Sequence, residues 1–289
     1  MIFGNFYDMA MPELQLETWA HQGAITTAKT TADSIKNALN SYTGWPDGIE
    51  FEIYLQGSYK NDTNIRGDSD VDVVAQLNST FYNNLSEDQK RTLGLSSASY
   101  GWSDFRADAL KALRNYYGQS FVIEGNKTLK VKANNGRLPA DVVVSSQYRK
   151  YKTVDNYDYV EGMCFWGNGR QITNYPKIHY KNGVSKHQST NEWYKPTARI
   201  FKNMRGSISG DATPSYFLEC LIYNAPHSKF GTSYQDSFCN IVNWLNETSL
   251  ESFMCKNGQH KLFGTSPEQW NTAQAQTFIK NVISLWNNW

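Results

Sequence analysis

Two aspartates stand two residues apart at the start of an apolar run. Asp70 and Asp72 precede a stretch that reads as a strand, in which alternate side chains share a face, so both carboxylates point the same way. Paired carboxylates on one face are typical of sites for Mg²⁺, a hard ion that takes oxygen ligands and substrate phosphates. Asp68 extends the run but is expected in the preceding turn. Because so short a motif also arises by chance, the pair needs support from elsewhere in the chain.

A third acid and a Gly-Ser pair give that support. Asp141 heads an otherwise apolar strand, where a buried carboxylate would need a cation or a metal as partner; the alternative is an exposed strand-end aspartate. Gly57 and Ser58 end the strand before Asp70, where a glycine lets the backbone approach a phosphate and the hydroxyl can bind it. The alternative for Gly57 is an ordinary turn glycine. The pattern predicts a site for two metal ions and a phosphate.

The elements that must position these residues follow from the hydrophobic periodicity. Residues 10–42 carry an apolar stripe at helical spacing and predict one long helix, and residues 49–55 alternate as a half-buried strand does. Further strands are expected at 71–77, 121–124, 128–132 and 140–145, a hairpin around 167–169, and helices at 86–93, 103–117, 191–208, 215–224, 234–247 and 267–286. Residues 57–69 are rich in turn formers.

This order of elements predicts an α+β fold with a mixed sheet followed by a helical half. We expect a catalytic lobe with a long N-terminal helix over residues 1–190 and a helical lobe over residues 191–289. The cleft where the two lobes would meet is the default position for a site.

Composition limits the classes of function. The 289 residues are 40% hydrophobic and carry 28 Lys and Arg against 27 Asp and Glu, which excludes wholesale disorder and disfavours a uniformly basic nucleic-acid coat. Residues 145–205 nevertheless hold eleven of the basic residues and only four acids. That segment is either a solvated face or a wall that binds phosphates.

The chain carries no sign of a membrane or secretory protein. No run approaches the ~18 apolar residues that a membrane span needs, and the start lacks the basic and apolar regions of a signal peptide. The four cysteines have no zinc-ligand spacing, so we read them as buried core residues: Cys164, Cys220, Cys239 and Cys255. Free thiols fit a reducing cytosol, and we expect a cytoplasmic protein.

Taken together, the motifs resemble a known superfamily. Gly57-Ser58, the run Thr63-x-Ile65-x-Gly67-x-Ser69-Asp70-Val71-Asp72 and the separate Asp141 are similar to the pattern of nucleotidyltransferases with the DNA polymerase β fold. Three further motifs resemble the bacterial cGAS/DncV-like nucleotidyltransferases, or CD-NTases, and among them the CdnE-type clade: Asn174-Tyr-Pro-Lys-Ile-His179, Tyr194-Lys-Pro-x-x-Arg199-Ile-x-Lys202 and Pro214-Ser-Tyr-x-x-Glu219. The resemblance covers residues 50 to 225.

The resemblance implies a role for each matched residue. Asp70, Asp72 and Asp141 would hold two Mg²⁺ ions, for which Mn²⁺ can substitute, and Gly57 and Ser58 would cradle the donor triphosphate. Further substrate contacts would come from residues of the helical lobe and its approach: Arg199, Lys202, Ser215 and His187. His187 follows Lys186 where the relatives are expected to have asparagine, so the pair of nucleotides stays open.

The implied activity is the joining of two, or three, nucleoside triphosphates into a cyclic oligonucleotide with release of pyrophosphate. ATP, UTP or both are the expected substrates, and a separate effector protein would read the product in anti-phage signalling. We expect a monomer with no nucleic-acid activator, because no zinc module is visible and the net charge is +1. Two alternatives remain: a nucleotidyltransferase that acts on RNA or protein, and an inactive nucleotide-binding module on the same fold.

Overall fold

The computed structural model describes residues 11–67, 70–154, 158–211 and 213–289, and it divides the chain into two compact units. The sheet unit consists of Ala24–Tyr59 and Ser69–Lys177. The helical unit consists of Met1–Gly23, Lys60–Asp68 and Ile178–Trp289. Segments of the two units therefore alternate along the chain, and the predicted domain boundary at residue 190 stays a prediction.

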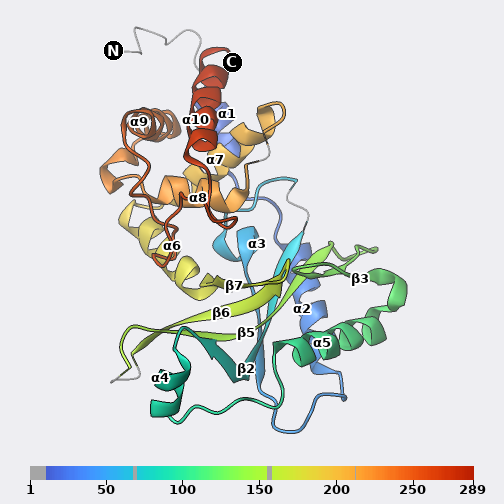
Figure 1. The fold of residues 1–289 in the computed structure, drawn as a ribbon. Helices are drawn as coiled ribbons and strands as arrows, with labels where there is room; N and C mark the ends of the chain where they lie inside the picture. Colours follow the sequence, from blue (N-terminus) through green and yellow to red (C-terminus); the bar gives the residue numbers. More distant parts are fainter. Residues whose placement is uncertain (1–10, 68–69, 155–157, 212) are drawn as a thin grey trace. The chain divides into compact units, whose positions relative to one another are not determined.

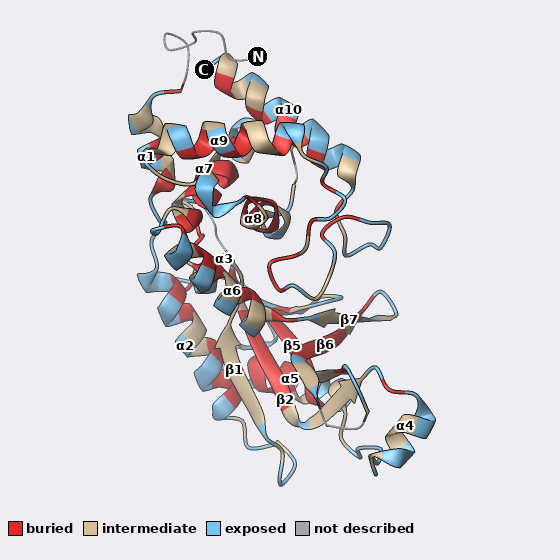
Figure 2. Ribbon diagram, turned by 90° about the vertical axis from the view of Figure 1, so that its left-hand side faces the viewer, coloured by how far each residue is buried: buried red, intermediate tan, exposed pale blue. Residues whose placement is uncertain are grey.

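The sheet unit contains one mixed sheet. Its strands are β1 (Phe51–Leu55), β2 (Val71–Asn83), β3 (Val122–Glu124), β4 (Leu129–Val131), β5 (Ala140–Tyr151), β6 (Tyr159–Gly167) and β7 (Arg170–Asn174). The order along the sheet is β1-β2-β5-β4-β3, and β6 pairs with both β5 and β7. Only β2 and β5 run parallel, while the other pairs are antiparallel. Both long strands are buried over much of their length, as Figure 2 shows.

Helices flank this sheet and form the second unit. They are α1 (Glu13–Ala20), α2 (Thr26–Asn40), α3 (Gly57–Asn61), α4 (Glu87–Thr92), α5 (Trp102–Tyr117), α6 (Pro176–Ser189), α7 (Tyr194–Ser207), α8 (Ser215–Tyr223), α9 (Tyr234–Glu247) and α10 (Thr272–Asn287), with short 3-10 turns at Gln119–Phe121 and His227–Lys229. Helices α2 and α5 cover one face of the sheet (Figure 1).

Each unit has its own apolar core. In the sheet unit, the odd-numbered positions Val71, Val73 and Ala75 of β2 pack with α2 and α5, as strand alternation requires. In the helical unit, α7 and α8 form the centre, and Phe201, Phe238 and Trp286 bring aromatic rings of α7, α9 and α10 together. The mixed sheet and the helical C-terminal half confirm the α+β fold class.

The predicted long N-terminal helix is wrong. Residues 21–25 interrupt it, so that α1 belongs to the helical unit and α2 to the sheet unit. Gly23 donates its backbone N–H to the Asn64 carbonyl at 3.0 Å, and a Cβ on Gly23 would lie 2.6 Å from the Ile65 oxygen. A long-range backbone contact ends the helix here, where the local apolar stripe would have continued it.

The predicted hairpin is confirmed, and two helices were missed. Gly167 pairs with Arg170 across a two-residue turn in which Asn168 and Gly169 both have positive φ, as a type I′ turn requires. The missed helices are α3, inside the turn-rich run, and α6, whose mixed residues form no apolar stripe. Pro176 at the first position of α6 is the signal that could have revealed it.

Candidate active site

Two of the predicted metal-binding acids lie side by side in the sheet. Asp72 of β2 is the register partner of Asp141 of β5, and the two strands are parallel neighbours. Because paired residues of adjacent strands point to the same side, both carboxylates share one face. That face carries Val74 and Val143 and is opposite the one that packs on α2 and α5. Residues 69 positions apart in the sequence thus become neighbours.

Gly57 lies against the Asp72 carboxylate. Its φ is +67°, and a Cβ built on it would stand 2.0 Å from Asp72 Oδ2. The adjacent Gln56 donates its backbone N–H to the Asp72 carbonyl at 3.0 Å. Both the positive φ and the close approach favour glycine at this position. The role of Gly57 at a phosphate stays a prediction, and the turn-glycine alternative stays open. Ser58 follows in the first turn of α3 and is half-buried.

A lysine faces the second of these acids. Lys130 of β4 is the register partner of Asp141, and its Nζ lies 3.6 Å from Asp141 Oδ1. Asp70 is exposed just before β2, and Asp68 lies outside the described residues. Among the described residues, no three His, Cys, Asp or Glu side chains are already arranged to hold a metal ion. The carboxylates of Asp72 and Asp141 are hard oxygen donors and fit a divalent cation such as Mg²⁺.

Two predicted substrate contacts lie in the interior of the helical unit. Lys202 is completely buried, and its Nζ donates to the Thr63 carbonyl at 2.8 Å and lies 3.2 Å from Glu219 Oε1. Arg199 is also buried and donates to the carbonyl oxygens of Ala20 and Asp62. Both cations thus bind the protein's own backbone. Their role as substrate contacts stays a prediction.

The other two predicted contacts are half-buried. Ser215, the first residue of α8, accepts a hydrogen bond from Arg205 Nη1 at 3.0 Å. His187 lies on α6, where burial and the positive charge of Lys195 lower its pKa. Its Nδ1 accepts the backbone N–H of Lys195 at 3.5 Å, which favours the neutral ring. Neither placement tests a contact with substrate.

Glu219 forms the centre of a buried charged cluster that the sequence did not predict. One carboxylate oxygen accepts the Thr63 hydroxyl at 2.5 Å and lies next to Lys202. The other lies 3.1 Å from Lys256 Nζ and 3.7 Å from His179 Nε2. A glutamate inside the apolar sequence of α8 was the available signal, because a buried carboxylate needs cationic partners.

The charges of this cluster shift the pKa values of its acid and its histidine. Burial alone would raise the pKa of Glu219, but Lys256, Lys202 and His179 outweigh it and hold the pKa well below its usual value. Burial and the nearby Lys256 lower the pKa of His179 to about 4. At neutral pH the cluster therefore holds an ionised Glu219 and a neutral His179 whose ring stacks on Tyr216 at 5.2 Å.

The neutral His179 predicts a pH-dependent stability. Above pH 6.5 the histidine is neutral in both the folded and the unfolded chain; as the pH falls towards 4, only the unfolded chain takes up a proton. Stability is therefore lost on acidification, by about 2 kcal/mol at pH 5 for this group. Urea unfolding at pH 7.5 and pH 5 should show a loss about 2 kcal/mol smaller for His179→Gln than for the unsubstituted protein. Equal losses would contradict the prediction.

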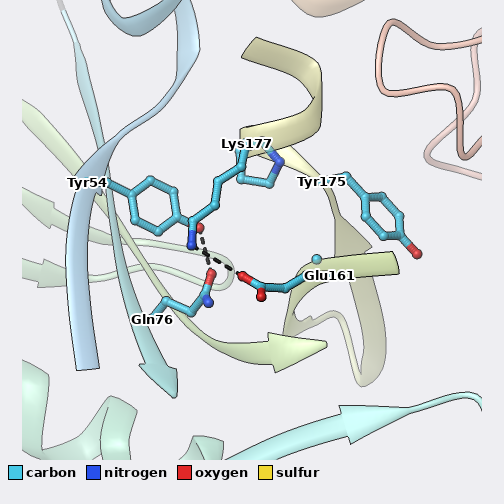
Figure 3. A pocket seen from close by; sticks show the side chains of 7 residues that line it. Tyr54, Gln76, Glu161, Tyr175 and Lys177 are labelled. Carbon is cyan, nitrogen blue, oxygen red and sulfur yellow. Dashed lines mark hydrogen bonds and ion pairs between the residues drawn. The ribbon is translucent and has the colours of Figure 1, made fainter. Parts of the chain in front are cut away.

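A small pocket lies in the sheet unit, on the same face as the two acids. Its lining includes Tyr54, Gln76, Glu161, Tyr175 and Lys177 (Figure 3). The Tyr54 hydroxyl donates to Gln76 Oε1 at 2.7 Å, and Lys177 lies 3.3 Å from Glu161 and also contacts Glu52. Burial, followed by the charges of the two glutamates, raises the pKa of Tyr54, so its hydroxyl stays protonated. These groups join β1, β2 and β6 to the start of α6.

Comparison with known proteins identifies the class. The family profile of the cGAS/DncV-like nucleotidyltransferase C-terminal helical domain matches residues 181–287. A cyclic UMP-AMP synthase of Rhodothermus marinus is 54% identical over 97% of this chain and 99% of its own length. A cyclic dipyrimidine nucleotide synthase of Legionella pneumophila is 34% identical over 91% of both chains. The chain is therefore a nucleotidyltransferase.

Solved structures agree with this class. The R. marinus CdnE c-UMP-AMP synthase, determined with Apcpp and Upnpp, superposes with a TM-score of 0.91 over 96% of this chain and 97% of that one. The Elizabethkingia meningoseptica CdnE cyclic dinucleotide synthase, with GTP and Apcpp, is 27% identical and gives a TM-score of 0.77 over 95% and 98%. The chain belongs to the CdnE-type enzymes of the cGAS/DncV-like nucleotidyltransferase family. The resemblance found in the sequence is confirmed.

No helix in the described ranges is both long enough and apolar enough to cross a membrane.

Proposed function

We propose that this enzyme joins ATP and UTP into a cyclic dinucleotide and releases two molecules of pyrophosphate. One observation carries the proposal: Asp72 and Asp141 stand in register, with Gly57 against Asp72, in a chain 54% identical to a cyclic UMP-AMP synthase over 97% of its length. The product would be a second messenger in anti-phage signalling, read by a separate effector, and the enzyme would act as a cytoplasmic monomer.

The chemistry follows from this arrangement. A ribose hydroxyl of one nucleotide attacks the α-phosphorus of the other; an O–P bond forms, the bond to the β-phosphate breaks, and pyrophosphate leaves. A second, equivalent attack closes the ring. Asp70, Asp72 and Asp141 would hold two Mg²⁺ ions, which lower the pKa of the attacking hydroxyl and neutralise the leaving group. Asp141 would take part at the attacking hydroxyl, and the proton of that hydroxyl goes to solvent.

The remaining residues have supporting roles in the proposal. Gly57 and Ser58 bring the backbone and one hydroxyl to the donor triphosphate, as the close approach of Gly57 to Asp72 supports. Substrate contacts by Arg199, Lys202, Ser215 and His187 stay predictions. The relatives differ in the nucleotides that their names give, from cyclic UMP-AMP to dipyrimidine and dipurine products, so the pair of nucleotides needs its own measurement.

Product analysis tests the proposal directly. The purified protein is incubated with Mg²⁺, four unlabelled nucleoside triphosphates and one α-³²P-labelled triphosphate at a time, then treated with phosphatase. We expect resistant label from ATP and from UTP, and a mass equal to the two monophosphates less two waters. Label on RNA or on the protein itself would support the macromolecular alternative. No product with Mg²⁺ or Mn²⁺, and no binding of Mg²⁺-NTP, would identify an inactive module.

A further inference from the structure

The segment between the Gly-Ser turn and the paired acids belongs to the helical unit, and other parts of that unit bind each of its residues from 61 to 64. Lys195 Nζ lies 2.6 Å from Asp62 Oδ2, and Arg199 donates to the Asp62 carbonyl. Thr63 has two such partners: Lys202 donates to its carbonyl oxygen, and Glu219 accepts its hydroxyl. Asn64 exchanges backbone and side-chain hydrogen bonds with Gly23, each 3.0 Å long.

The segment is also conformationally special. Asp62 has φ +56°, a left-handed conformation that costs free energy in any residue except glycine. Such a conformation persists only where the surroundings fix it from several sides. Lys195 and Arg199 hold its side chain and its carbonyl, and both cations are themselves buried.

The Glu219 cluster binds this segment at two residues, Asn61 and Thr63. Lys256 Nζ, 1% exposed, donates to Asn61 Oδ1 at 3.3 Å and lies 3.1 Å from Glu219 Oε2. Thr63 binds the other oxygen of the same carboxylate. Buried charges with several fixed hydrogen-bond partners tolerate little displacement, because moving a partner leaves a desolvated charge.

Helix α3 connects a residue that this cluster binds to the glycine beside Asp72. Asn61 is the last residue of α3, a five-residue helix that begins at Gly57. The helix hydrogen bonds couple its two ends, so a displacement of Asn61 also displaces Gly57. Gly57 in turn packs against Asp72 Oδ2 with no room for even a Cβ.

We propose that Glu219 and Lys256 are positioning residues for nucleotidyl transfer, acting through Thr63 and Asn61 to fix the segment that aligns Gly57 and Asp72. The proposal rests on the proposed function for the reaction it serves. It assigns neither residue a contact with substrate. Misalignment by about 1 Å at a reacting group lowers a rate on the order of a hundredfold, so a buried anchor of this kind affects turnover more than nucleotide binding.

The chain offers a matched pair of threonines for the test. Thr63 and Thr197 are both fully buried, but the Thr63 hydroxyl binds Glu219, whereas the Thr197 hydroxyl bonds to the Trp193 carbonyl of its own helical segment. Valine keeps the shape of either side chain and replaces the hydroxyl with a methyl group. Thr63→Val and Thr197→Val are compared with the unsubstituted enzyme, and Thr63→Ser serves as the conservative rescue.

Two measurements decide the outcome. We expect kcat to fall at least tenfold in Thr63→Val with KM for the nucleotides changed less than about twofold, and to recover in Thr63→Ser. We also expect faster hydrogen exchange of the backbone amides of residues 57–67 in Thr63→Val but not in Thr197→Val, at similar melting temperatures. Identical behaviour of the two valine variants, or a raised KM with unchanged kcat, would overturn the proposal.

Failure of the proposed function is recognised separately. If the unsubstituted protein forms no nucleotide product, the proposed function fails, and the exchange comparison alone then decides whether Thr63 anchors the segment. Unchanged exchange in Thr63→Val overturns the positioning role in that case. Faster hydrogen exchange confined to residues 57–67 supports the anchoring role of Thr63, in a protein that then catalyses a different reaction.

Discussion

Replacing Asp72 by asparagine is expected to lower the rate of cyclic-dinucleotide formation on the order of a thousandfold or more. Asparagine has the shape of aspartate but carries no negative charge, so it cannot neutralise a divalent cation next to Asp141. Metal ions contribute several kcal/mol to phosphoryl transfer, and each 1.36 kcal/mol corresponds to a factor of ten in rate. The initial rate of pyrophosphate release and the melting temperature are measured together.

The control for this substitution is Asp158→Asn in the same unit. Asp158 is 52% exposed and pairs with Lys152 at 3.1 Å, so its loss removes a surface ion pair of little energetic value. We expect an unchanged rate and an unchanged melting temperature. A fully active Asp72→Asn enzyme would refute the assignment of the metal-binding face.

The partner acid offers a second test of the same site. Asp72→Asn and Asp141→Asn should each cost nearly as much as the double substitution, because residues that act as a unit are not additive. Independent, additive losses would show that the two carboxylates serve different steps. The register partner Lys130 remains in all three variants, so its charge is common to the comparison.

The sequence placed the candidate acids on strands but could not show how they meet. The apolar residues around Asp72 and after Asp141 predicted a strand at each position. Such a pattern can be read from the sequence because it depends only on neighbouring residues. The register that makes them neighbours joins strands 69 residues apart and depends on the whole sheet. The contact of Gly57 with Asp72 has the same origin: a glycine is visible in the sequence, but the atom that excludes its Cβ is not.

The basic segment shows why charge patterns are harder to interpret. The excess of Lys and Arg over residues 145–205 predicted either a solvated face or a phosphate-binding wall. Three of these cations, Lys195, Arg199 and Lys202, are buried and bind Asp62, backbone carbonyls or Glu219. Their partners come from distant parts of the chain, so neither composition nor helical spacing could reveal them. The break at Gly23 was missed for the same reason.

Substituting Gly57 by alanine is the second change with a large expected effect. The Cβ would stand 2.0 Å from Asp72 Oδ2, so either the carboxylate or the turn must move. Alanine at φ +67° also costs roughly 1–2 kcal/mol of conformational free energy. We expect a loss of activity on the order of a hundredfold, because Asp72 would leave its place beside Asp141.

Gly48→Ala separates these two causes. Gly48 lies in the same unit with φ +77°, and nothing lies within 4 Å of a Cβ built on it. Both variants therefore carry the conformational cost and should lose stability in urea, whereas only Gly57→Ala should lose activity. If Gly48→Ala loses as much activity, backbone strain and not the displaced carboxylate explains the effect. If Gly57→Ala keeps its activity, the fixed alignment of Gly57 and Asp72 is unnecessary for the reaction, and the proposed positioning role of Glu219 and Lys256 loses its last step.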